Sequence, residues 1–170
     1  MKTTYLGLGS NIGDKEKNIL RAIALINTKF IILDYSSIYI TSPIGYREQP
    51  YFLNMVIKID SEGTTPYELL KFIKFSELEV GREKIFRWGP RSIDIDILYI
   101  DGIKIESENL FIPHKELLKR NFVLIPLSEI TEYITVDTKP IFIKEFINYN
   151  SLSTDSVILY KSKEDIVLNE

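Results

Sequence analysis

The chain has 170 residues, of which 45% are hydrophobic and 26% are charged, and its net charge at pH 7 is −3. This length suits one globular domain with its own core, and the weak negative charge argues against a general nucleic-acid-binding protein. The sequence contains no cysteine, which excludes disulfides, a thiolate nucleophile and a cysteine-based zinc site. No apolar run approaches the ~20 residues of a membrane span, and the first residues do not resemble a signal peptide. We therefore expect a soluble, cytoplasmic protein.

The first predicted elements are a strand at residues 4–8 and a helix from Asp14 to about residue 28. The strand is closed by Gly9-Ser10-Asn11. The glycines within residues 7–13 lie between a strand and a helix, and Asp34 follows at the spacing of a dinucleotide-binding fingerprint. We regard that fingerprint as the weaker interpretation, because the helix start is polar and the chain lacks the regular strand–helix alternation of such folds.

Two further strands are predicted at residues 30–40 and 51–59, with a turn-rich loop between them. The second strand has an apolar face, the expected core face, made of Leu53, Met55, Ile57 and Ile59. Its other face carries Phe52 beside Asn54, an aromatic ring and an amide that together suit a flat heterocycle. An ordinary half-buried strand is the alternative for this face.

The next helix is predicted to begin at Thr65, because Pro66 and Glu68 complete the pattern of an N-cap, first turn and capping box. Gly81 is expected to end it. We expect the buried stripe of the helix to consist of Leu69, Leu70, Ile73 and Leu78. Lys74 and Glu77 lie three residues apart on one face, near the cation-rich segment that follows the helix. A surface ion pair of little energetic value is the alternative to a functional role for them.

Residues 93–100 alternate with the period of a strand. The alternation predicts one face with Ile93, Ile95, Ile97 and Tyr99, and an opposite face with Asp94, Asp96, Leu98 and Ile100. Side chains two apart are roughly 7 Å apart along a strand, so Asp94 and Asp96 repel each other unless a cation lies between them. Such oxygen ligands suit Mg²⁺, which completes its shell with water and substrate phosphates.

The segment before this strand is rich in cations and contains the only tryptophan, Trp88. Arginine offers a bidentate fork and lysine a point charge, so the segment suits a polyphosphate through Arg82, Lys84, Arg87 and Arg91. Trp88 can stack on a flat ring. Together with the two carboxylates, the pattern indicates group transfer from a nucleoside triphosphate. The alternative is an edge strand with a charged solvent face.

Three elements are predicted in the last third of the chain. Asp101-Gly102 predicts a tight turn and a short hairpin with residues 103–105, residues 141–149 a helix, and residues 157–160 an added strand. The whole order is strand, helix, strand, strand, helix, strand, then extra helices. It suits an α+β fold: a ferredoxin-like antiparallel sheet with helices packed on it, plus extra C-terminal elements.

Residues 87–98, RWGPRSIDIDIL, resemble the R-W-G-P-R-x-x-D-[LIV]-D-[LIVM]-[LIVM] signature of the 6-hydroxymethyl-7,8-dihydropterin pyrophosphokinases. That family passes pyrophosphate from ATP to a pterin alcohol in folate biosynthesis and has the ferredoxin-like fold. The resemblance covers residues 4 to about 148. It implies a pyrophosphokinase domain at residues 1–150 and an extension of unknown role at residues 151–170.

The resemblance also implies roles for individual residues. Two Mg²⁺ ions would be held by Asp94 and Asp96, and the catalytic cations would be Arg82 and Arg91. The ATP contacts would be Leu70, Lys74, Lys84, Arg87, Trp88, Ile97, His114, Lys115 and Arg120, with Lys84, Arg87 and Trp88 on a closing loop. The pterin contacts would be Thr41, Ser42, Pro43, Ile44, Phe52, Asn54 and Phe122.

The sequence departs from the family pattern at two places. Residues 83–86 are about one residue shorter than usual, which leaves the division of labour among the cations open, and Lys115 stands where an aromatic is frequent. Two other classes are weighed against this reading. A polymerase-β-type nucleotidyltransferase places its carboxylates roughly ten residues after a Gly-Ser turn, whereas about eighty intervene here. A non-catalytic ferredoxin-like binding module would need no paired aspartates.

The implied partners are the substrates ATP and 6-hydroxymethyl-7,8-dihydropterin. We expect a monomer that can associate with other folate-pathway enzymes, and neither a nucleic-acid nor a membrane partner.

Overall fold

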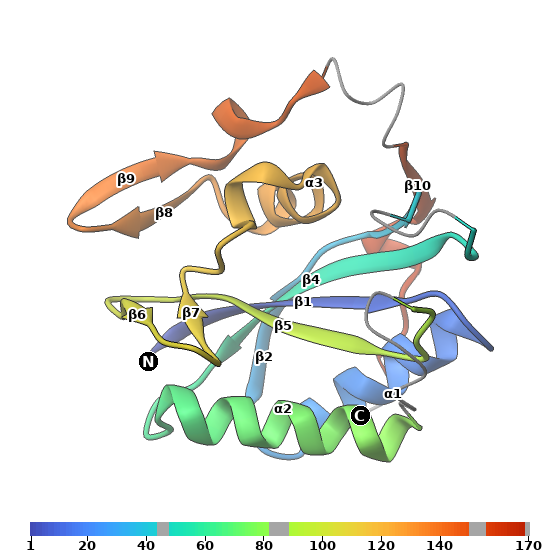
Figure 1. The fold of residues 1–170 in the computed structure, drawn as a ribbon, viewed down its shortest axis with the longest axis horizontal. Helices are drawn as coiled ribbons and strands as arrows, with labels where there is room; N and C mark the ends of the chain where they lie inside the picture. The colour runs from blue at the N-terminus through green and yellow to red at the C-terminus, as the bar shows by residue number, and fades with distance from the viewer. Residues whose placement is uncertain (44–47, 82–88, 150–155, 169–170) are drawn as a thin grey trace.

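The computed structural model describes residues 1–43, 48–81, 89–149 and 156–168. Its centre is an antiparallel sheet with the strand order β10-β3-β4-β1-β5, in which β2 also pairs with β4 (Figure 1). The strands are β1 (Thr3–Ser10), β2 (Ile31–Tyr35), β3 (Ile38–Thr41), β4 (Phe52–Asp60), β5 (Asp94–Ile100) and β10 (Val157–Lys161). Because β2 and β3 pair with successive parts of β4, they act as one interrupted strand. The predicted ferredoxin-like α+β class is confirmed.

Helices cover both faces of this sheet. One face carries α1 (Lys15–Asn27) and α2 (Pro66–Val80), and the other carries α3 (Asn121–Ile130) (Figure 1). Two small hairpins complete the described fold: β6 (Ile105–Glu106) with β7 (Phe111–Ile112), and β8 (Tyr133–Val136) with β9 (Lys139–Phe142). Short 3-10 turns span Leu117–Lys119, Ile143–Phe146 and Lys163–Asp165.

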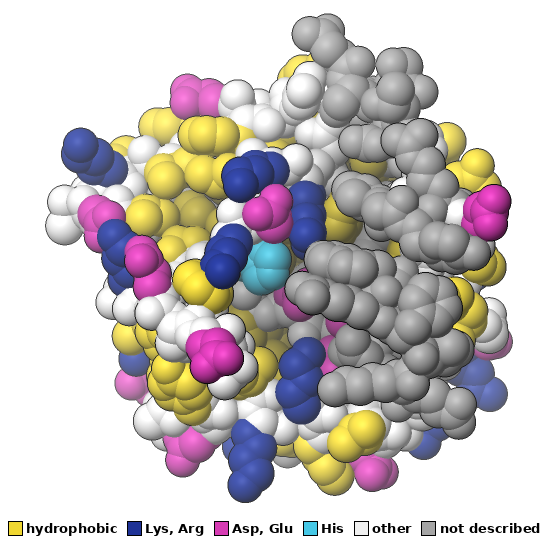
Figure 2. Space-filling model, in the orientation of Figure 1, with side chains coloured by type: hydrophobic (Ala, Val, Ile, Leu, Met, Phe, Trp, Pro, Cys, Tyr) yellow, Lys and Arg dark blue, Asp and Glu magenta, His cyan; other side chains and the backbone are white. Residues whose placement is uncertain are grey.

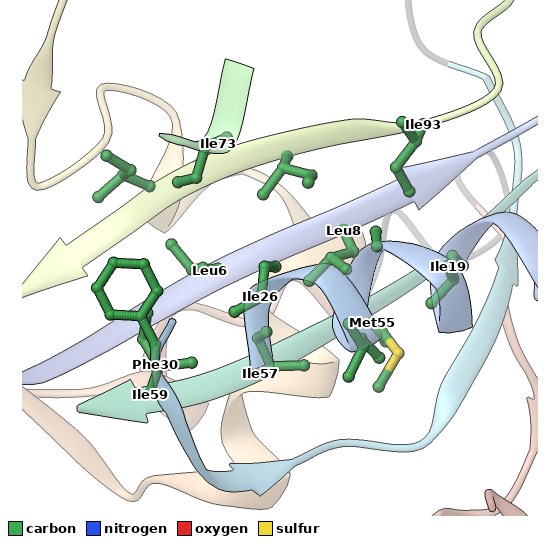
Figure 3. Packing of buried hydrophobic residues seen from close by; sticks show 14 of the residues in the cluster. Leu6, Leu8, Ile19, Ile26, Phe30, Met55, Ile57, Ile59, Ile73 and Ile93 are labelled. Atoms are coloured by element: carbon green, nitrogen blue, oxygen red, sulfur yellow. The ribbon is translucent and has the colours of Figure 1, made fainter. Parts of the chain in front are cut away.

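The two helix layers produce two hydrophobic clusters. The larger one lies between the sheet and helices α1 and α2 (Figure 3) and includes Leu6, Ile26, Ile57, Ile59 and Ile73. The smaller one lies on the α3 side and includes Tyr5, Val56, Leu98, Leu124 and Leu127. The predicted core face of β4 is confirmed. Its other face is partly covered as well, since Val56 is 1% exposed and belongs to the second cluster.

The predicted strand at residues 30–40 is wrong in one respect, because it is broken at Ser36 and Ser37. The Ser36 hydroxyl accepts from the backbone N–H of Val56 at 2.9 Å and donates to the Ser37 carbonyl. The Ser37 N–H donates to Glu129 of α3 at 2.8 Å. These side-chain bonds compete with the regular ladder, and the strand divides into β2 and β3.

The alternation predicted for β5 holds up to Ile97 and then changes face. The register slips between Tyr5 and Leu6, so that Tyr5 lies opposite Tyr99 and Leu6 opposite Ile97. This β-bulge inserts Leu98 as an extra residue. Tyr99 therefore joins the cluster on the α3 side, and Ile100 joins the cluster under α1 and α2. Both placements are opposite to the prediction.

Two other predictions in the last third of the chain are wrong. The tight turn at Gly102 is present, but β6 pairs with β7 and not with β5. Residues 141–149 contain the end of β9 and a 3-10 turn in place of a helix. The β8–β9 hairpin turns at Asp137 and Thr138, both with positive φ, a turn geometry that usually requires Gly or Asn. The predicted added strand is confirmed as β10.

The predicted ends of α2 are confirmed. Thr65 and Glu68 form a capping box, and Gly81 ends the helix in the left-handed conformation at φ 101°. Leu69 and Ile73 are buried as expected, but Leu78 is 67% exposed and does not belong to the buried stripe.

The contrast between Ile73 and Leu78 gives a test of how α2 is oriented. We expect Ile73→Ala to lower the free energy of unfolding by about 2–5 kcal/mol, because it leaves a cavity in the main cluster. The same truncation at Leu78 should change it by less than about 0.5 kcal/mol. Urea denaturation of both variants measures the difference, and equal losses would contradict the orientation described here.

Candidate active site

The two aspartates predicted as metal ligands lie at the start of β5. In the register with β1, Asp94 lies opposite Gly9 and Asp96 opposite Gly7. Figure 2 shows one face of the molecule with the single histidine near its centre, lysine and arginine side chains around it, and acidic groups beside it. The structure thus gathers the acidic and basic groups that the sequence places far apart.

The pKa of Asp96 depends on charged side chains from several elements of the fold. Burial raises the pKa of Asp96, and the neighbouring Asp94 raises it further, whereas the charges of His114, Lys74 and Arg120 lower it. These three side chains, two of them permanently cationic and one a histidine, come from α2, from the residue before α3 and from the segment after β7. Burial and the negative charge of Asp94 therefore make the ionised form of Asp96 unfavourable unless positive charge lies close to it. A bound metal cation would supply such charge.

Asp94 is paired with the predicted catalytic cation Arg91. Nη1 of Arg91 lies 2.7 Å from Oδ2 of Asp94. The backbone of Arg91 is fixed by Asn11, which is fully buried: its Oδ1 accepts from the Arg91 N–H at 2.8 Å, and its own N–H donates to the Arg91 carbonyl at 3.1 Å. The Asn11 side chain also donates to Gln49 and to the Pro50 carbonyl. Asn11 thus joins the segments before β4 and before β5.

The pair of Lys74 and Glu77 is more than a surface ion pair. The Lys74 ammonium lies 3.0 Å from Oε1 of Glu77, but Glu77 is only 2% exposed. Oε1 of Glu77 also accepts from the backbone N–H of Ile95 at 2.8 Å. Ile95 is the residue between the two aspartates, so this buried carboxylate fixes the strand that presents them. The alternative of a weak surface pair is wrong for this reason.

His114 is held through its backbone and one ring nitrogen. Its N–H donates to the Leu98 carbonyl at 2.8 Å, and its Nδ1 accepts from the N–H of Glu116 at 3.2 Å. In the neutral ring the proton therefore lies on Nε2. Burial lowers the pKa of His114, whereas the charge of Asp96 raises it. The ring is placed to donate a hydrogen bond from Nε2.

A second, neutral group of predicted residues meets on the other side of β1. Nδ2 of Asn54 donates to Oγ1 of Thr41 at 2.6 Å, and both side chains are buried. A Cβ added at Gly9 would lie 2.7 Å from Oδ1 of Asn54 and 3.7 Å from the ring of Phe52. Only glycine at this position of β1 leaves the Asn54 amide where it is, whereas the contact to Phe52 would be an ordinary one.

The remaining described candidates lie in several different surroundings. The Arg120 guanidinium lies 5.7 Å from the ring centroid of Phe122, and the Lys115 ammonium lies over the Phe111 ring. Leu70 packs at the margin of the main cluster and Ile97 within it. Ser42 and Pro43 follow β3. The other predicted residues lie outside the described residues: Ile44, Arg82, Lys84, Arg87 and Trp88.

The donor set fits magnesium bound together with a phosphate substrate. Within the described ranges no three acidic or histidine side chains form a metal cluster. A metal held by Asp94 and Asp96 would therefore have two protein ligand groups and further positions for water and phosphate oxygens. Mg²⁺ is commonly bound in this way. The repulsion and burial that raise the pKa of Asp96 are relieved by a cation between the carboxylates.

Two functional contacts were missed by sequence reasoning. The sequence marks Asn11 only as the end of a strand, and for Glu77 it indicates a functional position without the backbone contact to Ile95. Their roles depend on contacts between residues 80 and 18 positions apart, which no local pattern encodes. The one available signal for Asn11 was a strand that ends in small polar residues before a helix.

A groove of about 730 Å³ lies elsewhere, between α1 and β2, and contains none of the predicted site residues.

None of the helices in the described ranges has both the length and the apolar composition of a membrane span.

Comparison with known proteins gives a consistent result. The profile of the 7,8-dihydro-6-hydroxymethylpterin-pyrophosphokinase family matches residues 5–132. The 2-amino-4-hydroxy-6-hydroxymethyldihydropteridine pyrophosphokinase of Bacillus subtilis is 43% identical over 132 residues, which are 76% of this chain and 78% of that protein. The protein of the same name from Aquifex aeolicus is 42% identical over 161 residues, 94% of this chain and 99% of that one.

The solved structures agree in fold. The wild-type HPPK-DHPS of Plasmodium falciparum matches 99% of this chain with a TM-score of 0.66 at 15% identity, and this chain spans 47% of its length. At such low identity the likeness concerns the fold alone. The extent of the family match and the identity to the bacterial proteins carry the assignment: the chain belongs to the 7,8-dihydro-6-hydroxymethylpterin-pyrophosphokinase family.

Proposed function

We propose that Asp94 and Asp96 mark the catalytic centre at which this chain carries out the reaction of its family. The enzyme transfers pyrophosphate from ATP to the hydroxymethyl group of 6-hydroxymethyl-7,8-dihydropterin and releases AMP, a step of folate biosynthesis. The observation that carries the proposal is the convergence of Lys74, His114 and Arg120 on the aspartate pair, because a triphosphate and its metal need both kinds of charge in one place.

In the proposed reaction the hydroxymethyl oxygen attacks the β-phosphorus of ATP. The bond from the β-phosphorus to the oxygen that bridges to the α-phosphate breaks, AMP leaves with that oxygen, and the alcohol proton passes to Asp94 or to water. Two Mg²⁺ ions, held by Asp94 and Asp96, would supply charge neutralisation and alignment of the two substrates when bound. Catalysis of this kind depends on positioning and on stabilising the negative charge of the transition state.

The chain's own cations have distinct places in this proposal. Arg91, next to Asp94, is placed to neutralise charge on the transferred group, together with Arg82. His114 is placed to donate a hydrogen bond from Nε2 to a phosphate oxygen. Arg120 and Lys74 are proposed to contact the nucleotide. The further ATP contacts that we propose are Leu70, Lys84, Arg87, Trp88, Ile97 and Lys115.

On the neutral side, Phe52 and Phe122 are proposed to enclose the pterin ring, and Asn54 to read its polar edge. Thr41 fixes the amide of Asn54, so one orientation of the amide is presented to the ring. Ser42, Pro43 and Ile44 complete the proposed pocket. A site built to hydrogen-bond a substrate edge rejects analogues that lack it, because its buried polar groups would then remain unpaired.

We also propose the setting in which the enzyme works: a cytoplasmic monomer with no nucleic-acid or membrane partner, able to associate with other folate-pathway enzymes. The name of the solved relative, HPPK-DHPS, has two parts for a single chain, and this chain spans 47% of it. This supports the proposed association. Sedimentation of the protein alone, and mixed with another folate-pathway enzyme, tests the monomer and the association separately.

The metal ligands are tested by Asp96→Asn, which keeps the shape of the side chain and removes its charge. We expect turnover, measured as AMP released from ATP, Mg²⁺ and the pterin, to fall at least ~10³-fold, or about 4 kcal/mol of transition-state stabilisation. Thermal stability should not fall, because the repulsion from Asp94 is removed. Asp101→Asn, just beyond the other end of β5, is the control and should retain activity. Near-normal turnover in Asp96→Asn would refute the assignment.

The aromatic wall is tested by Phe122→Ala. Loss of one stacking face should weaken pterin binding by about 1–3 kcal/mol and leave the affinity for an ATP analogue nearly unchanged. Isothermal titration calorimetry with each ligand measures both values, and Phe142→Ala, an aromatic truncation on β9, is the control. A loss of ATP affinity in place of pterin affinity would assign Phe122 to the nucleotide.

The close approach at Gly9 gives an independent test of the pterin side. In Gly9→Ala the new methyl group must displace the Asn54 amide, so we expect the KM for the pterin to rise about tenfold while the KM for ATP stays constant. Gly7→Ala is the matched control on the same strand, since its Cβ would lie 3.4 Å from the end of the Leu98 side chain, a contact that small shifts can accommodate. Equal effects of the two substitutions would show that Asn54 is not the group affected.

A further inference from the structure

The C-terminal strand β10 lies beyond the region that the family profile matches, which ends at residue 132. It pairs antiparallel with β3, so that Val157 lies opposite Thr41 and Ile158 opposite Ile40. It therefore extends the main sheet at the edge where β3 leads into the proposed pterin pocket (Figure 1).

The far end of this strand is firmly attached to the body of the protein. Nζ of Lys161 lies 2.6 Å from Oε1 of Glu16 on α1. The Lys163 ammonium pairs with Asp34, and its backbone N–H donates to the Ser37 hydroxyl at 3.1 Å. Ile166 is 6% exposed and belongs to the main hydrophobic cluster. Contacts to α1, β2 and the core thus fix where β10 begins and ends along β3.

The near end of the strand reaches the proposed pocket. Ser156 and Ser42 are joined by two hydrogen bonds: their hydroxyl oxygens lie 2.8 Å apart, and the Ser42 N–H donates to the Ser156 carbonyl at 3.3 Å. The residue before Ser42 is Thr41, whose hydroxyl accepts from Nδ2 of Asn54 at 2.6 Å. A continuous chain of bonds therefore links the anchored tail to the amide proposed to read the pterin.

We propose that Ser156 is a positioning residue for pterin recognition. Acting through Ser42 and Thr41, it holds the end of β3 in register, so that Asn54 is oriented before the pterin arrives. Residues that are fixed beforehand lose less conformational entropy on binding. The proposal rests on the pterin site proposed above and gives the C-terminal segment a role in the affinity for that substrate.

The test is steady-state kinetics of Ser156→Ala with each substrate varied in turn. We expect the KM for the pterin to rise about three- to tenfold, the loss typical of one hydrogen bond. The KM for ATP, kcat and the melting temperature should stay at the values of the unchanged protein. Ser156→Thr, which keeps the hydroxyl, should restore the pterin KM. Ser162→Ala, the same truncation further along the tail where the hydroxyl donates to Glu164, is the matched control and should leave all four quantities unchanged.

A double substitution tests the path through Ser42. If the two hydroxyls act as one unit, Ser156→Ala should add little to the pterin KM of Ser42→Ala. An unchanged pterin KM in Ser156→Ala would overturn the proposal, as would a joint shift of both KM values and the melting temperature, which would indicate a structural role only.

Failure of this inference is distinguishable from failure of the site itself. If Phe122→Ala weakens pterin binding while Ser156→Ala does not, the pterin site stands and the positioning role falls. If neither Phe122→Ala nor Gly9→Ala affects the pterin, the proposed pocket is misplaced and the role of Ser156 falls with it.

Discussion

The repulsion between Asp94 and Asp96 governs the arrangement of everything around them. Burial and the neighbouring carboxylate raise the pKa of Asp96, so the pair is unfavourable unless positive charge is close. The fold supplies that charge from separate elements, with Lys74 on α2 and Arg120 before α3, and it places the His114 ring beside them. Groups with perturbed pKa values are concentrated at functional sites. Here the raised pKa of Asp96 marks a place to which a cation would be attracted. The cation would in turn attract phosphate oxygens.

The two aspartates can act together only if the strand that carries them is held in place. That strand, β5, lies at the edge of the sheet and has a neighbouring strand on one side only. Two buried polar side chains hold it in place. Glu77 of α2 accepts the N–H of Ile95, between the aspartates, and Asn11, just beyond the end of the paired strand β1, fixes the backbone of Arg91 before them. Removing either partner would leave a buried polar group without its bond, which costs more than the bond itself contributes. The strand that carries the two aspartates is thereby held by side-chain bonds as well as by its pairing with β1.

The sequence was informative wherever one local rule decides the structure. The capping box at Thr65, the helix end at Gly81 and the apolar face of β4 follow from short-range patterns, and the signature around Asp94 and Asp96 identified the family. The errors occurred where a non-local contact overrides the pattern. The hydroxyls of Ser36 and Ser37 break a strand because Val56 and Glu129 are at hand, and a bulge at Leu98 reverses the faces of Tyr99 and Ile100. The alternation of residues along a strand predicts neither the break nor the bulge.

The two sides of the proposed active site differ in their chemistry for a physical reason. A triphosphate is recognised by charge, which acts over several ångströms and tolerates flexible lysine and arginine side chains. A neutral heterocycle offers only its faces and hydrogen-bonding edges, so its recognition depends on short contacts of fixed direction. The proposed pterin side is accordingly made of small or buried groups held by one another: Gly9 makes room for Asn54, Thr41 orients it, and β10 holds the end of β3. The proposed role of β10 follows the same principle, because a strand paired along β3 restricts the movement of the segment that leads to Ser42.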